Sequence, residues 1–281
     1  MRLRPTAAAA VLALPALFAP PSAAQSGGTP APADPGPPSA CPAAYPGDDA
    51  GRRAFARWMA RGAAVRDLPG ELPVMAGLAE SGLRNLNRRG NPYAGFFSMH
   101  RSLSAGPYLG FPQEPELQLR WFTDTAIAVR QRAIAEGNDD FGTETAGYGL
   151  WIADVERPAR ENRDGYQPYL DDAEALLPAS CRPSSHVVDT SPPRLGVRAA
   201  RRQRGLLSVR VRCPGEPCMA AARAQPRRRV RVAATASVED APVTLTLARR
   251  SAGGARLVVE VTAVDEAGNA SRARRRVTLL R

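Results

Sequence analysis

The hydrophobic pattern of this 281-residue chain changes its period at a proline-rich segment, Pro178–Pro193. Before that segment, apolar side chains recur every three or four residues, most clearly in Glu116–Ile134, and this spacing predicts helices. After it, apolar and polar side chains alternate, as in Leu207–Cys213, and alternation between regular turns predicts antiparallel strands. The sequence therefore predicts a multidomain α and β protein, with a mainly α-helical domain followed by an antiparallel β-sandwich.

The charge of the chain changes near the same place. Residues 1–181 hold 17 arginines and 20 acidic residues, a net charge of −3, whereas residues 182–281 hold 21 arginines and 7 acidic residues, a net charge of +14. This asymmetry supports two domains of different character. Every basic residue is arginine and none is lysine, so a bias in composition is one explanation of the basic end. Attraction to an anionic polymer is the other.

The first residues have the order of a secretory signal peptide. A basic start at Met1–Arg4 precedes an apolar run at Ala7–Ala19 and small residues at Ser22–Ala24. The apolar run is shorter than the about 20 residues that a membrane-spanning helix needs, and no later stretch predicts a transmembrane segment. We expect a signal peptide over 1–24, a Pro/Ala-rich linker over 25–40, and a secreted or cell-envelope protein.

Four cysteines fit an oxidising compartment. The natural pairing is Cys41 with Cys181 and Cys213 with Cys218, although three connectivities are possible and free buried thiols are an alternative. The chain has two histidines and no CxxC motif, so nothing predicts a zinc site. We expect neither a metal nor a cofactor.

The predicted borders are 41–181 for the helical domain, 182–194 for a second linker and 195–281 for the sandwich. Residues 83–109 have no helical period and predict a long ordered loop or hairpin, a kind of segment that is often functional. The expected helices are Arg52–Val65, Pro69–Ser81, Glu116–Ile134, Trp151–Val155 and Arg163–Leu177.

Glu80 lies near the end of its predicted helix, and Gly82 is placed to end that helix as a left-handed cap. One turn before Glu80, Ala76 and Gly77 leave a flat face that another chain or a ligand could approach. The carboxyl end of a helix and partial burial both oppose ionisation of a carboxyl group, which suits a general acid. The alternative is an ordinary solvated acid near a helix end.

The segments ELPVMAGLAESGL and GFFSM, followed by the aromatic helix, resemble the lysozyme-like fold of soluble lytic transglycosylases. In that family the Glu of a Glu-Ser pair is the catalytic acid, which Glu80 and Ser81 match. Ser98 in GFFSM stands where the family usually has a Gln that positions sugar. A tyrosine of a third motif could be Tyr148 or Tyr166. The substrate-binding candidates that the resemblance implies are Ser81, Tyr93, Phe97, Ser98, Met99 and Tyr148.

The resemblance implies cleavage of peptidoglycan between MurNAc and GlcNAc, with the N-acetyl group assisting and an anhydro-sugar as product. Such chemistry needs one catalytic carboxyl group, and Glu71, roughly 13 Å away along the same helix, is too far to be a partner. Ser98 and the lack of a clear third motif favour a non-catalytic wall-binding protein on a decayed lysozyme-like domain. A third possibility is an adhesive or structural surface protein.

The segments DTSPPRL at 189–195 and VTAVDEAGNAS at 261–271 resemble the start and the late hairpin of bacterial immunoglobulin-like modules. That resemblance implies a fold and no particular activity. Within it, arginines on the strands suggest anionic envelope polymers as partners. Nucleic acid is disfavoured because the protein is expected to be exported.

Overall fold

The computed structural model describes residues 41–178, 181, 189–203, 206–225, 231–238, 241–248 and 256–278. The predicted signal peptide and first linker at 1–40, and most of the second linker at 182–188, lie outside the described residues. The described residues form five α-helices and antiparallel sheets, which confirms a mixed α and β protein.

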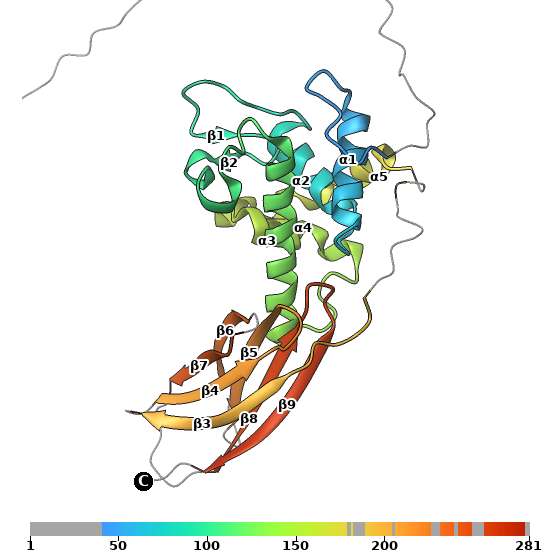
Figure 1. Cartoon of the computed structure of the whole chain (residues 1–281). Helices are drawn as coiled ribbons and strands as arrows, with labels where there is room; N and C mark the ends of the chain where they lie inside the picture. The colour runs from blue at the N-terminus through green and yellow to red at the C-terminus, as the bar shows by residue number, and fades with distance from the viewer. Residues whose placement is uncertain are drawn as a thin grey trace, which may run out of the picture. The chain divides into compact units, whose positions relative to one another are not determined.

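The helices agree with the predicted ones to within a few residues, apart from the last (Figure 1). There, two short 3₁₀ turns, η4 (Arg160–Gly165) and η5 (Gln167–Tyr169), take up the first half of the helix expected over Arg163–Leu177. The α-helices are α1 (Arg52–Ala64), α2 (Glu71–Ser81), α3 (Pro115–Ala135), α4 (Tyr148–Glu156) and α5 (Leu170–Leu176).

One hydrophobic core holds the helical region together. The apolar stripe of α3 is buried, with Phe122 and Ala126 inaccessible to solvent, and α3 contacts both α1 and α4. The indole of Trp151 on α4 donates a hydrogen bond to the Ala126 carbonyl at 3.0 Å. The largest buried side chains of this core also include Phe96, Phe97, Phe111, Met59, Leu72, Met75, Leu83 and Met99.

The long segment between α2 and α3 is ordered, as predicted. It contains a short hairpin, β1 (Tyr93–Ala94) with β2 (Met99–His100), and the 3₁₀ turns η1 (Arg101–Leu103) and η2 (Gly106–Tyr108). The fully buried side chain of Gln118, on α3, holds this segment in place.

Gln118 uses both ends of its amide. Its oxygen accepts the Phe96 amide N–H at 2.9 Å, and its nitrogen donates to Asn85 at 3.1 Å and to the Phe111 carbonyl at 3.0 Å. Gly95 has a left-handed φ of 84°, and a side chain there would collide with the Gln118 amide. The hairpin is thus pinned beside the end of α2.

The second region consists of a three-stranded sheet, β3-β4-β7, and a four-stranded sheet, β6-β5-β8-β9, both antiparallel. Leu207, Val209 and Val211 of β4 are buried, while the alternating residues Arg210 and Arg212 are exposed, as predicted. Both sheets contribute to one core. The strands are β3 (Gly196–Gln203), β4 (Leu206–Arg212), β5 (Cys218–Gln225), β6 (Arg231–Val238), β7 (Val243–Ala248), β8 (Arg256–Val264) and β9 (Ala270–Thr278).

Both predicted disulfides are confirmed. Cys41 is bonded to Cys181, which joins the two ends of the helical region, and Cys213 is bonded to Cys218 across the turn between β4 and β5. Two disulfides fit an extracellular protein. Among the residues that the structure describes, no helix has both the length and the apolar character needed to span a membrane.

The two segments that resemble the immunoglobulin-like modules lie against each other. The Asn269 side chain, in the turn between β8 and β9, donates a hydrogen bond to the Asp189 carbonyl at 2.8 Å. The Asn269 amide N–H also donates to the Asp265 carboxylate at 2.8 Å. Asn269 therefore closes its own turn and fixes the start of the sheet region.

Candidate functional site

Glu80 is the penultimate residue of α2 and is partly exposed. The helix ends at Gly82, whose φ of 65° is left-handed, so the predicted cap is confirmed. The next residue, Leu83, also has a left-handed φ of 56°, and its amide donates back to the Gly77 carbonyl at 2.9 Å. The chain reverses sharply just after Glu80, which leaves its carboxyl group at the end of a rigid helix.

The Ser81 side chain is buried and holds this reversal. Its hydroxyl donates to the Gly77 carbonyl at 3.0 Å and accepts the Arg84 amide N–H at 3.2 Å. The side chain points into the turn, so its hydrogen bonds explain a serine at this position without a substrate.

The flat face at Gly77 is covered by the protein itself. Leu83 folds back over it, and a Cβ on Gly77 would lie only 2.8 Å from a Leu83 methyl carbon, with Met59 also close at 3.6 Å. Gly77 therefore makes room for Leu83 at the chain reversal. The sequence alone allowed a ligand on this face, but the protein's own side chains fill it.

The Tyr166 hydroxyl donates a hydrogen bond to Glu80 Oε1 at 2.6 Å. Tyr166 lies between η4 and η5 and is 4% exposed. Burial raises the pKa of Tyr166, and the hydrogen bond to Glu80 and the charge of Glu80 raise it further. The phenol therefore stays neutral and remains a donor to the Glu80 carboxylate.

Tyr148, the other tyrosine considered, lies elsewhere. It begins α4, is buried against Trp151, and lines a pocket with Gly70 and Glu71 at the start of α2. Of the two tyrosines, Tyr166 is therefore the one hydrogen-bonded to Glu80.

A second carboxyl group, Glu156, lies near Glu80. Glu156 is the last residue of α4, and its Oε1 is buried with no hydrogen-bond partner among the described residues. Burial raises the pKa of Glu156 well above the ordinary value, and repulsion from the nearby Glu80 raises it further. Both effects favour the protonated form of the Glu156 carboxyl group.

Sequence reasoning considered only Glu71 as a partner for Glu80 and missed Glu156. One signal was available, because α2 and α4 are both short, apolar helices with a glutamate as the last or the penultimate residue, ELPVMAGLAES and YGLWIADVE. Glu71 and Tyr148, near the beginnings of the two helices, line the same pocket, while Glu80 and Glu156, near their ends, interact.

Ser98 reaches the backbone of Glu80. Its hydroxyl donates to the Glu80 carbonyl at 3.2 Å, and its own φ of 45° is left-handed, which is unusual for a residue with a side chain. The β1–β2 hairpin, pinned by Gln118, therefore contacts the end of α2 through Ser98.

The remaining substrate-binding candidates divide by exposure. Phe97 is 1% exposed and stacks on Phe122 with ring centroids 4.8 Å apart, and Met99 is also buried, so both side chains pack in the core. Tyr93 is 51% exposed, and its ring lies edge-on to the His100 ring with centroids 5.3 Å apart. Tyr93 is the predicted aromatic candidate whose side chain is available to a sugar.

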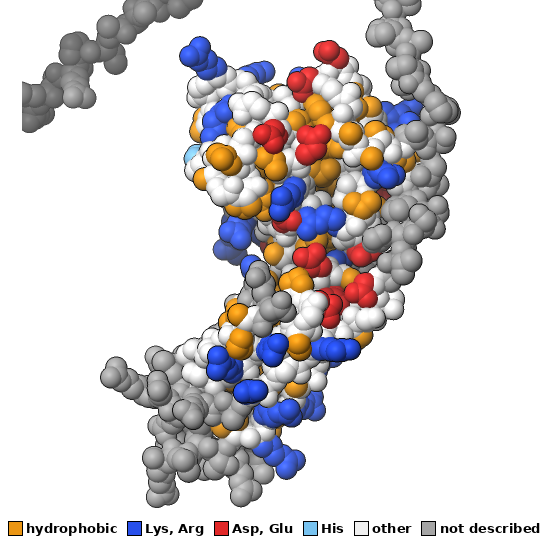
Figure 2. All heavy atoms as spheres, in the orientation of Figure 1, with side chains coloured by type: hydrophobic (Ala, Val, Ile, Leu, Met, Phe, Trp, Pro, Cys, Tyr) orange, Lys and Arg blue, Asp and Glu red, His pale blue; other side chains and the backbone are white. Residues whose placement is uncertain are grey.

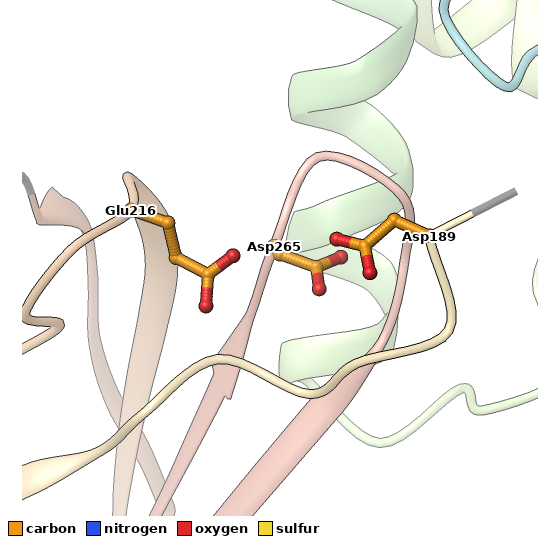
Figure 3. Close-up of side chains that lie close together, drawn as sticks. All are labelled: Asp189, Glu216 and Asp265. Carbon is orange, nitrogen blue, oxygen red and sulfur yellow. The ribbon is translucent and has the colours of Figure 1, made fainter. Parts of the chain in front are cut away.

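Three carboxylates gather in the sheet region. Asp189, Glu216 and Asp265 turn oxygen atoms toward one another, all within 4.8 Å (Figure 3). The buried Asp265 already accepts the backbone N–H of Asn269 at 2.8 Å and its side-chain N–H at 3.0 Å. These bonds give Asp265 a structural role in its turn, and we assign no ion to the group.

Comparison with known proteins leaves the site to be interpreted from its geometry. No model of a known protein family matches the chain, and a search of curated proteins finds no significant similarity.

Proposed function

We propose that the chain is a secreted enzyme that cleaves the glycan strand of peptidoglycan between MurNAc and GlcNAc, with Glu80 as acid and base. In this proposal the helical region is a lysozyme-like domain and the two sheets are an immunoglobulin-like module. The supporting observation is the hydrogen bond from Tyr166 to Glu80 Oε1, because it joins two segments 86 residues apart at one carboxyl group.

The arrangement suits general acid catalysis. The bond from Tyr166 holds Oε1, which leaves Oε2 to carry the proton to the glycosidic oxygen. The N-acetyl group of MurNAc then assists departure, and Glu80, now a carboxylate, takes the proton of the attacking hydroxyl as the anhydro-sugar forms. In this mechanism Glu80 is the one carboxyl group that contacts substrate, and Oε1 of Glu156 is shielded from solvent.

The test is mass analysis of the products released from purified peptidoglycan. We expect anhydro-muropeptides from the wild-type protein and a loss of roughly 10²- to 10⁴-fold in their rate of release for Glu80→Gln, which keeps the shape but cannot donate the proton. Glu71→Gln, on the same helix, is the matched control and should retain most of the activity. Equal rates for wild type and Glu80→Gln would refute the assignment.

A wild-type protein that releases nothing from several glycans would favour the non-catalytic alternatives, a wall-binding protein on a decayed lysozyme-like domain or a surface adhesin. Binding of intact peptidoglycan distinguishes these two alternatives. The helical region of a wall-binding protein binds peptidoglycan, whereas that of an adhesin does not.

A specific observation also supports attachment to anionic envelope polymers. Arg198 on β3 and Arg210 on β4 lie directly opposite each other, both exposed, and Arg212 follows on the same face of β4. Like charges in opposite positions destabilise a sheet unless an anion lies between them. On the face drawn in Figure 2, several basic side chains are scattered over the described part of the sheet region, while acidic side chains gather mainly elsewhere.

A further inference from the structure

Two exposed arginines meet at the carboxyl end of α2, just after Glu80. Arg52 reaches this end from the first residue of α1, and Arg84 follows the chain reversal. The position that a Cβ would occupy on Gly82 lies 3.3 Å from Nη2 of Arg52 and 3.9 Å from Nε of Arg84. Apart from the chain neighbours of Gly82, no other described atom lies within 4 Å of that point. The two guanidinium groups therefore converge over one glycine.

The fold explains only one of these two charges. Arg84 donates a hydrogen bond to the Ser81 carbonyl at 3.2 Å, and a cation at the carboxyl end of a helix is stabilising. Arg52 lies at the amino end of its own helix, where the helix dipole favours an acidic residue. The guanidinium of Arg52 makes no hydrogen bond or ion pair with another described residue. Its charge is therefore left without a structural role.

The acidic residues just before α1 do not neutralise Arg52. Asp48 accepts hydrogen bonds from the Tyr45 hydroxyl at 2.5 Å and from the Asn85 side chain at 3.2 Å. Asp49 forms no ion pair with a described residue. Two like charges that converge without a counter-charge raise the free energy of the folded protein, and an anion bound between them would lower it. The convergence therefore indicates a site for an anionic group.

The candidate catalytic acid is not that anion. Glu80 forms no ion pair with Arg52 or Arg84 in the described part of the chain, and its Oε1 accepts the hydrogen bond from Tyr166. An ion pair with an arginine would favour the ionised form of Glu80, whereas a general acid must start with its proton. The two arginines thus remain open to a ligand that reaches the same end of α2.

We propose that Arg52 and Arg84 bind a carboxylate of the glycan substrate, beside the bond that Glu80 cleaves. This proposal rests on the proposed function. A guanidinium group presents its N–H donors in a planar fork that matches the two oxygens of a carboxylate. In peptidoglycan the carboxylate is either the lactyl group of MurNAc, where the peptide has been removed, or a carboxylate of the peptide itself. A chain of GlcNAc alone has neither.

The test measures binding of three soluble oligosaccharides of equal length to the full chain carrying Glu80→Gln, which should bind glycan without cleaving it. The first is a GlcNAc chain without carboxylates, the second a GlcNAc–MurNAc chain with free lactyl groups, and the third the same chain bearing peptides. We expect Arg52→Gln to weaken binding of a carboxylate-bearing chain about fivefold, as an exposed ion pair does, and to leave the GlcNAc chain unaffected. The chain that loses affinity identifies the source of the carboxylate.

Arg53→Gln is the matched control, because Arg53 is the next residue of α1, is also exposed and carries the same charge. It should leave all three affinities unchanged. Arg52→Lys keeps the charge but not the fork, so it should recover part of the affinity. Equal losses in Arg52→Gln and Arg53→Gln, or a loss in Arg52→Gln that is the same for the GlcNAc chain, would overturn the site.

The outcomes separate this site from the proposed enzyme. Binding of carboxylate-bearing chains that depends on Arg52, in a protein whose wild type never cleaves them, would keep the site and refute the enzyme. Cleavage by the wild type, with binding that Arg52→Gln does not change, would keep the enzyme and overturn the site. Binding of none of the three chains would overturn the site as well.

Discussion

The polar side chains that shape the helical region are buried, whereas those that characterise the sheet region lie on its surface. Gln118 is inaccessible to solvent and makes three hydrogen bonds with fixed partners. Arg198, Arg210 and Arg212 are exposed and repeat along neighbouring strands. A buried polar group makes directional hydrogen bonds that are stronger because the surrounding dielectric constant is low. Exposed charges attract a partner through their combined charge, and salt screens that attraction. The difference agrees with the proposal, in which bond-breaking chemistry belongs to the first region and weak, unspecific attraction to the second.

The largest expected contrast concerns the two disulfides. In the chain-entropy model, the Cys41–Cys181 bond spans 140 residues and contributes about 5 kcal/mol, against about 2 kcal/mol for the five-residue separation of Cys213 and Cys218. We replace both cysteines of each pair with alanine, in separate variants. The variant without the Cys41–Cys181 bond should lose more stability than the variant without the Cys213–Cys218 bond. Urea unfolding followed by circular dichroism, which reports both helices and strands, measures the loss of stability in each variant. Equal losses in the two variants would show that loop length does not set the difference.

A single buried polar side chain provides the next contrast. Gln118→Met keeps the length of the side chain but leaves the Phe96 N–H without its partner, while the Phe111 carbonyl keeps the hydrogen bond from the Glu114 N–H at 3.2 Å. At about 1–3 kcal/mol for an unsatisfied buried group, we expect a loss of about 2 kcal/mol in the free energy of unfolding. Gln113→Met is the control, because Gln113 is exposed in the same segment and should change stability by less than about 0.5 kcal/mol. Similar losses would mean that Gln118 does not pin the loop.

The helical region should also show the pH dependence of Glu156, whose Oε1 is shielded from solvent. The folded protein raises the pKa of Glu156, so unfolding releases its proton at any pH between the ordinary and the raised value. The stability due to this group is complete below the ordinary glutamate pKa of about 4.3 and is lost as pH rises through the raised value. Glu156→Gln should therefore be more stable than wild type at pH 7, with the advantage shrinking toward pH 4. Thermal unfolding across this range measures the gap, and a constant gap would contradict the buried, protonated state.

The two regions also differ in how far their sequences predict them. The helices of the first region follow from apolar periodicity and caps such as Gly82. In the second region, strand β5 was not predicted, because it shows no alternation. Ala220 and Ala222 of β5 face the core between the sheets, while Ala221 on the other side packs against Ile134 of α3. A strand covered on both faces loses the period of two. The edge strands β3 and β9 were missed because their arginines hide the alternation.

The candidate site was predictable only where its signals are local in the sequence. Glu80 is recognisable because the helix signals and the Glu-Ser pair lie in one short segment. Its partners Tyr166 and Glu156 come from segments that only the tertiary fold brings near, so no local pattern predicts the contacts. Phe97 illustrates the opposite error, since an aromatic residue in a functional loop also suits the core, where the structure places it.

The smallest expected effect tests the surface of the sheet region. Arg198 and Arg210 repel each other across β3 and β4, so Arg198→Gln should raise stability by a few tenths of a kcal/mol at low salt. If the two arginines share an anionic polymer, the same variant should be retained less by cell wall, and wild-type retention should fall steeply as salt increases. Arg276→Gln on β9 is the matched control, because it removes the same charge from a position opposite Val258. Equal loss of retention in both variants would mean that net charge alone attracts the wall. Retention that is insensitive to salt and to both substitutions would leave arginine-rich composition as the explanation of this surface.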